Sequence, residues 1–306
     1  MRQLQCEVLH FINQFDSRKD TFVAYLCQIK IFMIDKWLNY KERTPSPYTY
    51  FRVIDVSENK NPDKDIMDYL GEQVLSAYRN LDFLKLQFES ESEAELRKYV
   101  ENYIFPDTTD QLGKNVRQGD FGEILASLIV SYFQKLTIPI QKLKWKFNSN
   151  KSVFCTDMIA HNSGKDIEEI YYYEIKSRLG NKKETVGGEN HHVTIHAHNS
   201  LLRDEQNPNE GIADFLSRYY FEKDDFDNAK KYGDIVKSPK NYKKNFELFF
   251  IIEKKEFIEE ILKDLNQLPP TLKPLGVTVV LIENLKVLVV ETQKYATEKA
   301  VEYVRK

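Results

Sequence analysis

The feature that most constrains this chain is an apolar segment, residues 170–176, that ends in Glu174-Ile175-Lys176. Its tyrosines and isoleucines are typical of a β-strand. Because side chains alternate between the two faces of a strand, Tyr172, Glu174 and Lys176 share one side. The sequence therefore predicts a carboxylate and an ammonium side by side at the end of an apolar strand.

Two segments upstream predict an antiparallel meander that ends in this strand. Lys144–Phe147 is expected to form the first strand and residues 152–160 the second, which carries Asp157. Residues 148–151 and 162–165 have turn compositions. Asp157 precedes Glu174 by 17 residues, so the two carboxylates are expected on neighbouring strands.

A helix is predicted just before the meander. Asp120 is a good N-cap, and an apolar pattern of helical period runs from Phe121 to Phe133. Glu123 would then lie in the first turn, beside small residues that permit close packing. Asp120 and Glu123 also fit a capping box, in which the glutamate only satisfies backbone donors.

A helix with an early glutamate, a strand with Asp and a strand with Glu-x-Lys form the sequence pattern of the PD-(D/E)XK nuclease superfamily, which this chain resembles. Four segments are more specifically similar to HamA, the nuclease subunit of Hachiman anti-phage defence systems. They are residues 117–125 (RQGDFGEIL), 154–157 (FCTD), 173–177 (YEIKS) and 281–286 (LIENLK). The resemblance extends over about residues 110–295.

The resemblance implies a mixed α/β fold with a central mixed sheet flanked by helices. It also implies that Asp157 and Glu174, with the Ile175 carbonyl, bind Mg²⁺ or Mn²⁺. Magnesium favours this set because it takes oxygen ligands from one or two carboxylates, substrate phosphate and water. Lys176 would orient the attacking water, and Glu123 would support this metal or a second one. Alternatively, Asp157 is an edge-strand charge, and Glu174 and Lys176 form a solvated face.

The implied function is that of a metal-dependent DNase, the effector of an anti-phage system, restrained and activated by a partner helicase subunit (HamB-like). A restriction- or repair-type nuclease with its own sequence preference is one alternative. A non-catalytic adaptor that regulates a helicase is another. The chain has no Gly-x-x-x-x-Gly-Lys-Ser/Thr motif and therefore no recognisable nucleotide switch of its own.

Positive charge gathers around the predicted site although the net charge is only −3. Residues 141–183 hold nine Lys or Arg against five Asp or Glu, which leaves 35 basic and 42 acidic residues elsewhere. This local excess predicts contacts with a phosphate backbone. The side chains expected to make them are Lys144, Lys146, Arg178, Lys182 and Lys183. The alternative is that Lys142, Lys144 and Lys146 form the solvent face of an edge strand.

The predicted domain boundary lies in the linker 105–114. It separates an N-terminal α/β extension, residues 1–110, from a nuclease-like domain, residues 111–306. Three cysteines without metal spacing, no signal peptide and no apolar stretch long enough for a bilayer predict a cytoplasmic protein without membrane contact. The cluster His191, His192, His196 and His198 suggests zinc, but no nearby Cys or carboxylate completes the usual spacing.

The other elements follow from periodicity and from Gly and Pro breaks. Helices are predicted over residues 64–79, 90–103, 199–205, 212–221, 225–236, 256–265 and 291–305. Strands are predicted over residues 48–56, 246–252, 277–282 and 285–290.

Overall fold

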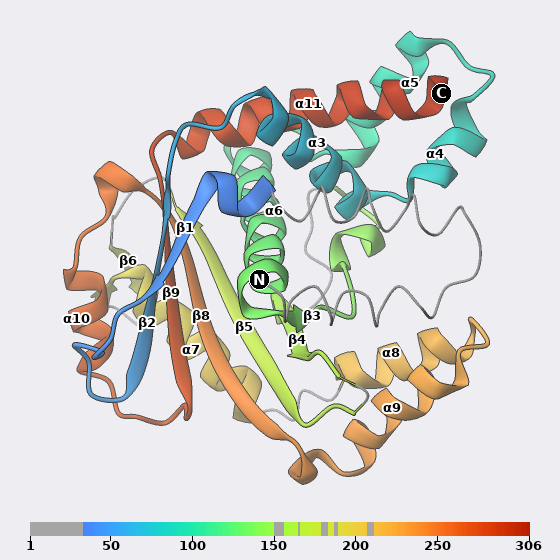
Figure 1. The fold of residues 1–306 in the computed structure, drawn as a ribbon. Helices are drawn as coiled ribbons and strands as arrows, with labels where there is room; N and C mark the ends of the chain where they lie inside the picture. Colours follow the sequence, from blue (N-terminus) through green and yellow to red (C-terminus); the bar gives the residue numbers. More distant parts are fainter. Residues whose placement is uncertain (1–32, 150–155, 165, 179–182, 187–188, 207–210) are drawn as a thin grey trace, which may run out of the picture.

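The computed structural model describes residues 33–149, 156–164, 166–178, 183–186, 189–206 and 211–306. They form a seven-stranded mixed sheet in the order β1-β2-β9-β8-β5-β4-β3 (Figure 1). Its strands are β1 (Leu38–Glu42), β2 (Phe51–Glu58), β3 (Leu136–Thr137), β4 (Met158–Asn162), β5 (Glu169–Arg178), β8 (Lys243–Glu253) and β9 (Leu275–Ile282). A separate hairpin joins β6 (Glu184–Val186) to β7 (Glu189–His191).

The four central strands, β2, β9, β8 and β5, run parallel to one another. Strands covered on both faces are expected to be apolar without alternation. β8 fits this rule, because residues 245–253 are all buried. The meander is completed by β4, which pairs antiparallel with β5, and by the short β3.

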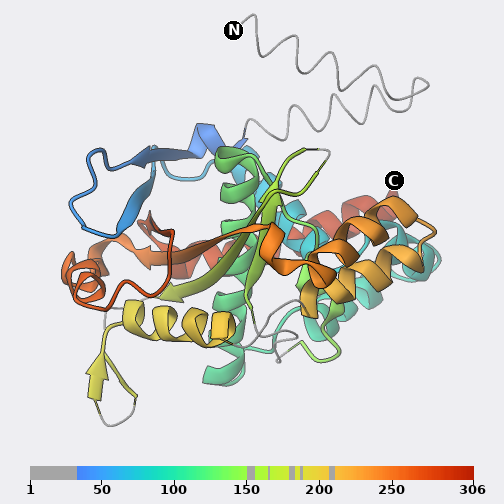
Figure 2. The ribbon, with the colours of Figure 1, turned by 90° about the horizontal axis from the view of Figure 1, so that it is seen from below.

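Helices cover both faces of the sheet (Figures 1 and 2). One face carries α6, with α3 and α11 packed side by side, and the other face carries α7 and α10. The longer helices are α3 (Lys64–Tyr78), α6 (Gln111–Ile129), α7 (Val193–Gln206), α8 (Gly211–Phe221), α9 (Phe226–Lys237) and α11 (Leu285–Arg305). The shorter ones are α4 (Leu81–Phe88), α5 (Glu93–Tyr99) and α10 (Glu260–Asn266). The π-helical turns η1 (Val100–Ile104) and η2 (Val130–Gln134) continue α5 and α6.

The mixed α/β fold predicted from the sequence is confirmed. Residues on either side of position 110 share one sheet and one core. β2 lies between β1 and β9, and α3 packs along α11. The strands predicted over residues 48–56, 246–252 and 277–282 and the helices predicted over 64–79, 212–221 and 225–236 are present, with ends shifted by a few residues.

Three predicted elements are wrong. Residues Lys144–Phe147 do not form a strand, because Lys142–Trp145 is a 3₁₀ turn (η3), and the first strand of the meander is β3. Residues 285–290 are the start of α11, whose buried positions follow helical spacing. α6 begins nine residues before Asp120, where the Asp110 side chain accepts a hydrogen bond from the Gly113 amide.

Candidate active site

Asp157, Glu174 and Lys176 lie close together near the C-terminal end of β5, just before β4 begins. In the pairing of β4 with β5, Met158 lies opposite Tyr173. Asp157 precedes Met158 and Glu174 follows Tyr173, so in this antiparallel register the two carboxylates lie opposite each other. The Lys176 Nζ lies 2.5 Å from Glu174 Oε1 and 4.0 Å from Asp157 Oδ2. Asp157 Oδ2 also accepts a 2.8 Å hydrogen bond from the Ile175 amide. Asp157 lies in a bend just before β4, not on the predicted strand.

Glu174 is the most deeply buried carboxylate of this group. The residue is 2% exposed, and its Oε2 has no hydrogen-bond partner among the described residues. Burial, and then the neighbouring negative charge of Asp157, raise the pKa of Glu174 to about 7, against the attraction of Lys176 and a smaller hydrogen-bonding contribution from Ser200 of α7. A buried oxygen without a partner is costly unless a further cation or donor joins it.

A second ammonium links Asp157 to the helix α6. Lys142 Nζ lies 3.2 Å from Glu123 Oε1 and 3.5 Å from Asp157 Oδ1, and it donates to the Thr156 carbonyl. Burial raises the pKa of Glu123 to about 8, although Lys142 opposes the shift. Lys142 is therefore part of the site rather than the solvent face of a strand. Periodicity missed this role because it assigned the segment to a strand.

Glu123 lies in the middle of α6, so the capping-box interpretation is wrong. The close packing expected from the small residues is present. Gly122 lies so near Ser177 that a Cβ added to the glycine would be 2.8 Å from the Ser177 Cβ. α6 thereby packs directly on the end of β5 that carries Lys176.

Asp120, the predicted cap, has a different role. It is buried, and its carboxylate accepts bonds of 2.6 and 2.7 Å from Lys146 Nζ and one of 2.5 Å from the Tyr78 hydroxyl. The group joins α3, α6 and the segment that follows η3. Burial raises the pKa of Asp120, and Lys146 and Tyr78 oppose the shift.

The site opens into a cavity of about 1390 Å³. Its lining contains eight basic residues, Lys114, Arg117, Lys142, Lys146, Lys176, Arg178, Lys183 and Lys286, and four acidic ones, Asp120, Glu123, Asp157 and Glu256. Of the residues predicted to contact nucleic acid, Arg178, Lys183 and Lys146 line it. Lys146 is bound to Asp120. Lys144 is exposed and is not part of the lining, and Lys182 lies outside the described residues.

The profile of the HamA family matches residues 31–294. The chain belongs to the HamA family. This family is associated with Hachiman anti-phage defence systems, which include a helicase, so the resemblance predicted from sequence is confirmed. The match includes all four of the predicted catalytic positions and starts well before residue 110. A search of curated proteins gave no match.

The oxygens of this HamA chain fit a divalent cation of the magnesium type. Asp157 and Ile175 line the cavity, and Glu174, which is buried and not part of the lining, lies opposite Asp157 in the register of β4 and β5. Magnesium needs only one or two carboxylates from a protein. Lys142 contacts both Glu123 and Asp157 and so connects Glu123 to these oxygens. Among the described residues, no group of three or more His, Cys, Asp or Glu side chains is arranged to hold a metal ion.

The described histidines have other partners. His192 Nδ1 lies 2.6 Å from Asp264 Oδ2, while the His191 side chain is outside the described set. His198 is buried, and its Nδ1 lies 3.4 Å from the Asn199 side-chain oxygen. None of the described helices is both long and apolar enough to cross a bilayer.

Proposed function

We propose that this chain is a metal-dependent DNase, the effector of a Hachiman-type defence system in the bacterial cytoplasm. The observation that carries the proposal is the buried Glu174 with an unpartnered oxygen, opposite Asp157 and next to Lys176. A buried carboxylate and a lysine at the end of an apolar strand, beside a second carboxylate, are costly for folding alone. Such perturbed groups in a cavity mark functional sites.

Asp157, Glu174 and the Ile175 carbonyl would hold Mg²⁺ or Mn²⁺. The bound ion would supply an acidified water and neutralise phosphate charge. Lys176, whose side chain is 28% exposed and lies between two carboxylates, is placed to orient a water or donate to a phosphate oxygen. Lys142, which contacts both Glu123 and Asp157, would compete with the ion for these carboxylates.

The cavity favours a polyanion as substrate. Its volume of about 1390 Å³ exceeds the ~300–1,000 Å³ typical of small-molecule sites. Basic side chains outnumber acidic ones in the lining by eight to four, and Lys183 and Lys286 are exposed. Lys286 belongs to the C-terminal segment of the HamA resemblance, and the fold brings it to the same cavity as Glu123.

Cleavage of plasmid DNA by the purified chain, with Mg²⁺, Mn²⁺ or EDTA, tests the proposal. Glu174→Gln, Asp157→Asn and Lys176→Met should each abolish metal-dependent cleavage while thermal unfolding remains cooperative. The matched control is Glu298→Gln, which alters an exposed ion pair with Arg97 and should cleave normally. Full cleavage by folded Glu174→Gln protein would show that the assignment is wrong. If the wild-type chain cleaves under none of these conditions, the alternative function of a non-catalytic adaptor is favoured.

Restraint by a helicase is the second part of the proposal. A nuclease without a nucleotide switch of its own would endanger the host chromosome if it were always active. Co-expression with a helicase encoded beside it, followed by purification through a tag on one partner, should recover both. Recovery of this chain alone, with cleavage independent of the helicase and of ATP hydrolysis, would contradict the restraint.

A further inference from the structure

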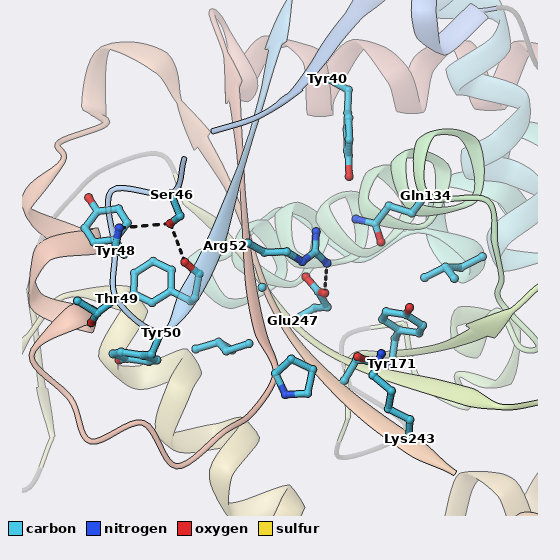
Figure 3. A pocket seen from close by; sticks show the side chains of 16 residues that line it. Tyr40, Ser46, Tyr48, Thr49, Tyr50, Arg52, Gln134, Tyr171, Lys243 and Glu247 are labelled. Carbon is cyan, nitrogen blue, oxygen red and sulfur yellow. Dashed lines mark hydrogen bonds and ion pairs between the residues drawn. The ribbon is translucent and has the colours of Figure 1, made fainter. Parts of the chain in front are cut away.

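A second cavity, of about 780 Å³, lies beyond the C-terminal end of α6. Figure 3 shows Arg52 of β2 reaching across its floor to Glu247 of β8, with Gln134 and Tyr40 on one side and Tyr48 and Tyr50 on another. Glu123 and Gln134 are eleven positions apart, which is roughly 16 Å along a helix. The cavity is therefore separate from the candidate active site and shares none of its lining residues.

Two charged residues on the floor of this cavity interrupt the apolar pattern of the sheet. Position 247 shares its face of β8 with Phe249 and Ile251, and position 52 shares its face of β2 with Ile54 and Val56, all four of which are fully buried apolar residues. At 52 and 247 the chain instead carries an ion pair. The Glu247 side chain is 3% exposed and the Arg52 side chain 37%, so the pair is buried on its carboxylate side; replacing a buried ion pair with apolar residues is often neutral or stabilising. Folding alone therefore does not account for this pair.

Oε2 of Glu247, a residue that is 2% exposed, has no hydrogen-bond partner among the described residues. Nε2 of Gln134 also lacks a partner at normal hydrogen-bond length among them, but the Gln134 side chain interacts with the nearby Tyr40 hydroxyl. Gly276 lies between Arg52 and Glu247 in the register. A Cβ on Gly276 would lie 2.2 Å from Glu247 Oε2, so only glycine leaves room for the carboxylate. Buried atoms of this kind are normally satisfied.

We propose that this cavity binds the base of a nucleotide. The floor offers an acceptor, Glu247, next to donors on Arg52 and Gln134. This combination matches base edges that carry an N–H donor beside a ring acceptor or carbonyl, which all of the nucleic-acid bases present. Aromatic side chains in the lining, among them Tyr40 and Tyr171, supply surfaces for a planar ring. Lys243 at the rim forms an ion pair with Glu169 at 2.9 Å, and its side chain is 57% exposed, so it can also reach a phosphate on the solvent side.

Calorimetry with GMP, AMP, CMP, UMP and ribose 5-phosphate tests the proposal on the full chain. The four nucleotides should bind one per chain, at least about 10-fold tighter than ribose 5-phosphate, which carries no base. A single-stranded tetranucleotide forms the second arm. Tighter binding of the tetranucleotide would identify a DNA or RNA strand as the source of the base, and equal binding would identify a free nucleotide. No saturable binding of any nucleotide at millimolar concentration, or equal binding of ribose 5-phosphate, would overturn the proposal.

The double variant Arg52→Met/Glu247→Leu separates a ligand site from a structural ion pair. It should unfold at the same temperature as wild type or higher, yet bind the nucleotides at least about 10-fold more weakly. The control is Arg97→Met/Glu298→Leu, which removes an exposed Arg–Glu pair and should bind normally. Unchanged binding in the cavity variant would refute the assignment.

Gln134→Glu provides a test that does not depend on how the double variant folds. It keeps the acceptor for the Tyr173 hydroxyl, which donates to Gln134 Oε1 at 2.7 Å, and removes the Nε2 donor. Nucleotide binding should weaken while the unfolding temperature stays close to that of wild type. Normal binding by this variant would remove Gln134 from the proposed site.

Discussion

Lys146→Met distinguishes a structural lysine from one that contacts nucleic acid. In the structure the Lys146 and Asp120 side chains are 4% and 7% exposed, and Nζ is 2.6 Å from the nearer carboxylate oxygen. Methionine keeps much of the aliphatic stem but removes the ammonium. Loss of one partner of a buried pair costs ~3–5 kcal/mol. We expect about 3 kcal/mol here, the low end of that range, because Tyr78 still donates to Asp120 and the carboxyl can protonate.

Urea unfolding followed by tryptophan fluorescence measures this cost, which corresponds to a fall of roughly 5 °C in melting temperature. Lys294→Met is the control, because its ion pair with Glu291 has a similar length, 2.7 Å, but is exposed. It should change stability by less than ~1 kcal/mol. The Lys146→Met/Asp120→Asn double variant should lose less than the sum of the single variants.

The pH dependence of the Lys146→Met effect has a definite sign. With the ammonium gone, the pKa of Asp120, already raised by burial, rises further. The difference from wild type should therefore be largest near neutral pH and shrink as acid protonates Asp120 in both proteins. A stable Lys146→Met protein with weakened DNA binding would refute this reasoning and restore the sequence-based prediction of a phosphate contact.

Other predictions follow from the same contacts. Lys183→Met should weaken DNA binding, measured by fluorescence anisotropy, without changing stability, because Lys183 is exposed on the cavity lining. Gly122→Ala should lower stability by ~1–3 kcal/mol and reduce cleavage, since its Cβ would lie 2.8 Å from that of Ser177; unchanged melting would show that α6 can move away. Lys142→Met should tighten Mn²⁺ binding in calorimetry, because an ammonium 3.5 Å from Asp157 opposes a cation; weaker binding would mean that Lys142 organises the ligands instead. Burial raises the pKa of Glu247 from 4.5 to about 7, so its contribution favours folding below pH 4.5 and is lost as pH rises to about 7. Arg52→Met/Glu247→Leu should abolish this part of the pH–stability profile, and an unaltered profile would assign it to other groups.

The sequence predicted the parts of the site that depend on local pattern. The apolar strand that carries Glu174 and Lys176 has a period that fixes which side chains share a face. The chain length between Asp157 and Glu174 fits one turn between two antiparallel strands, and the register places the two carboxylates opposite each other. These inferences need only alternation and a short connection.

The parts that failed depend on contacts between distant segments. Lys142 and Lys146 alternate as in a strand, but burial against α6 bends their segment into a 3₁₀ turn and turns both ammoniums inward. Residues 285–290 are apolar enough for a strand, and their packing beside α3 makes them helical. The Arg52–Glu247 pair was missed because its members are 195 residues apart and neither has a local motif.

Glu174 and Glu247 lie on neighbouring strands and share a physical signature. Glu247 pairs in register with Tyr173, so it lies on the opposite face of the sheet from Glu174. Each is 2% exposed, each has a cation on one oxygen, and in each the Oε2 lacks a partner among the described residues. A sheet this apolar would gain stability from a leucine at either position. In a folding sequence the local pattern and the overall fold usually agree, and positions where they disagree concentrate at functional sites. Glu174 and Glu247 are two such positions, one on each face of the sheet.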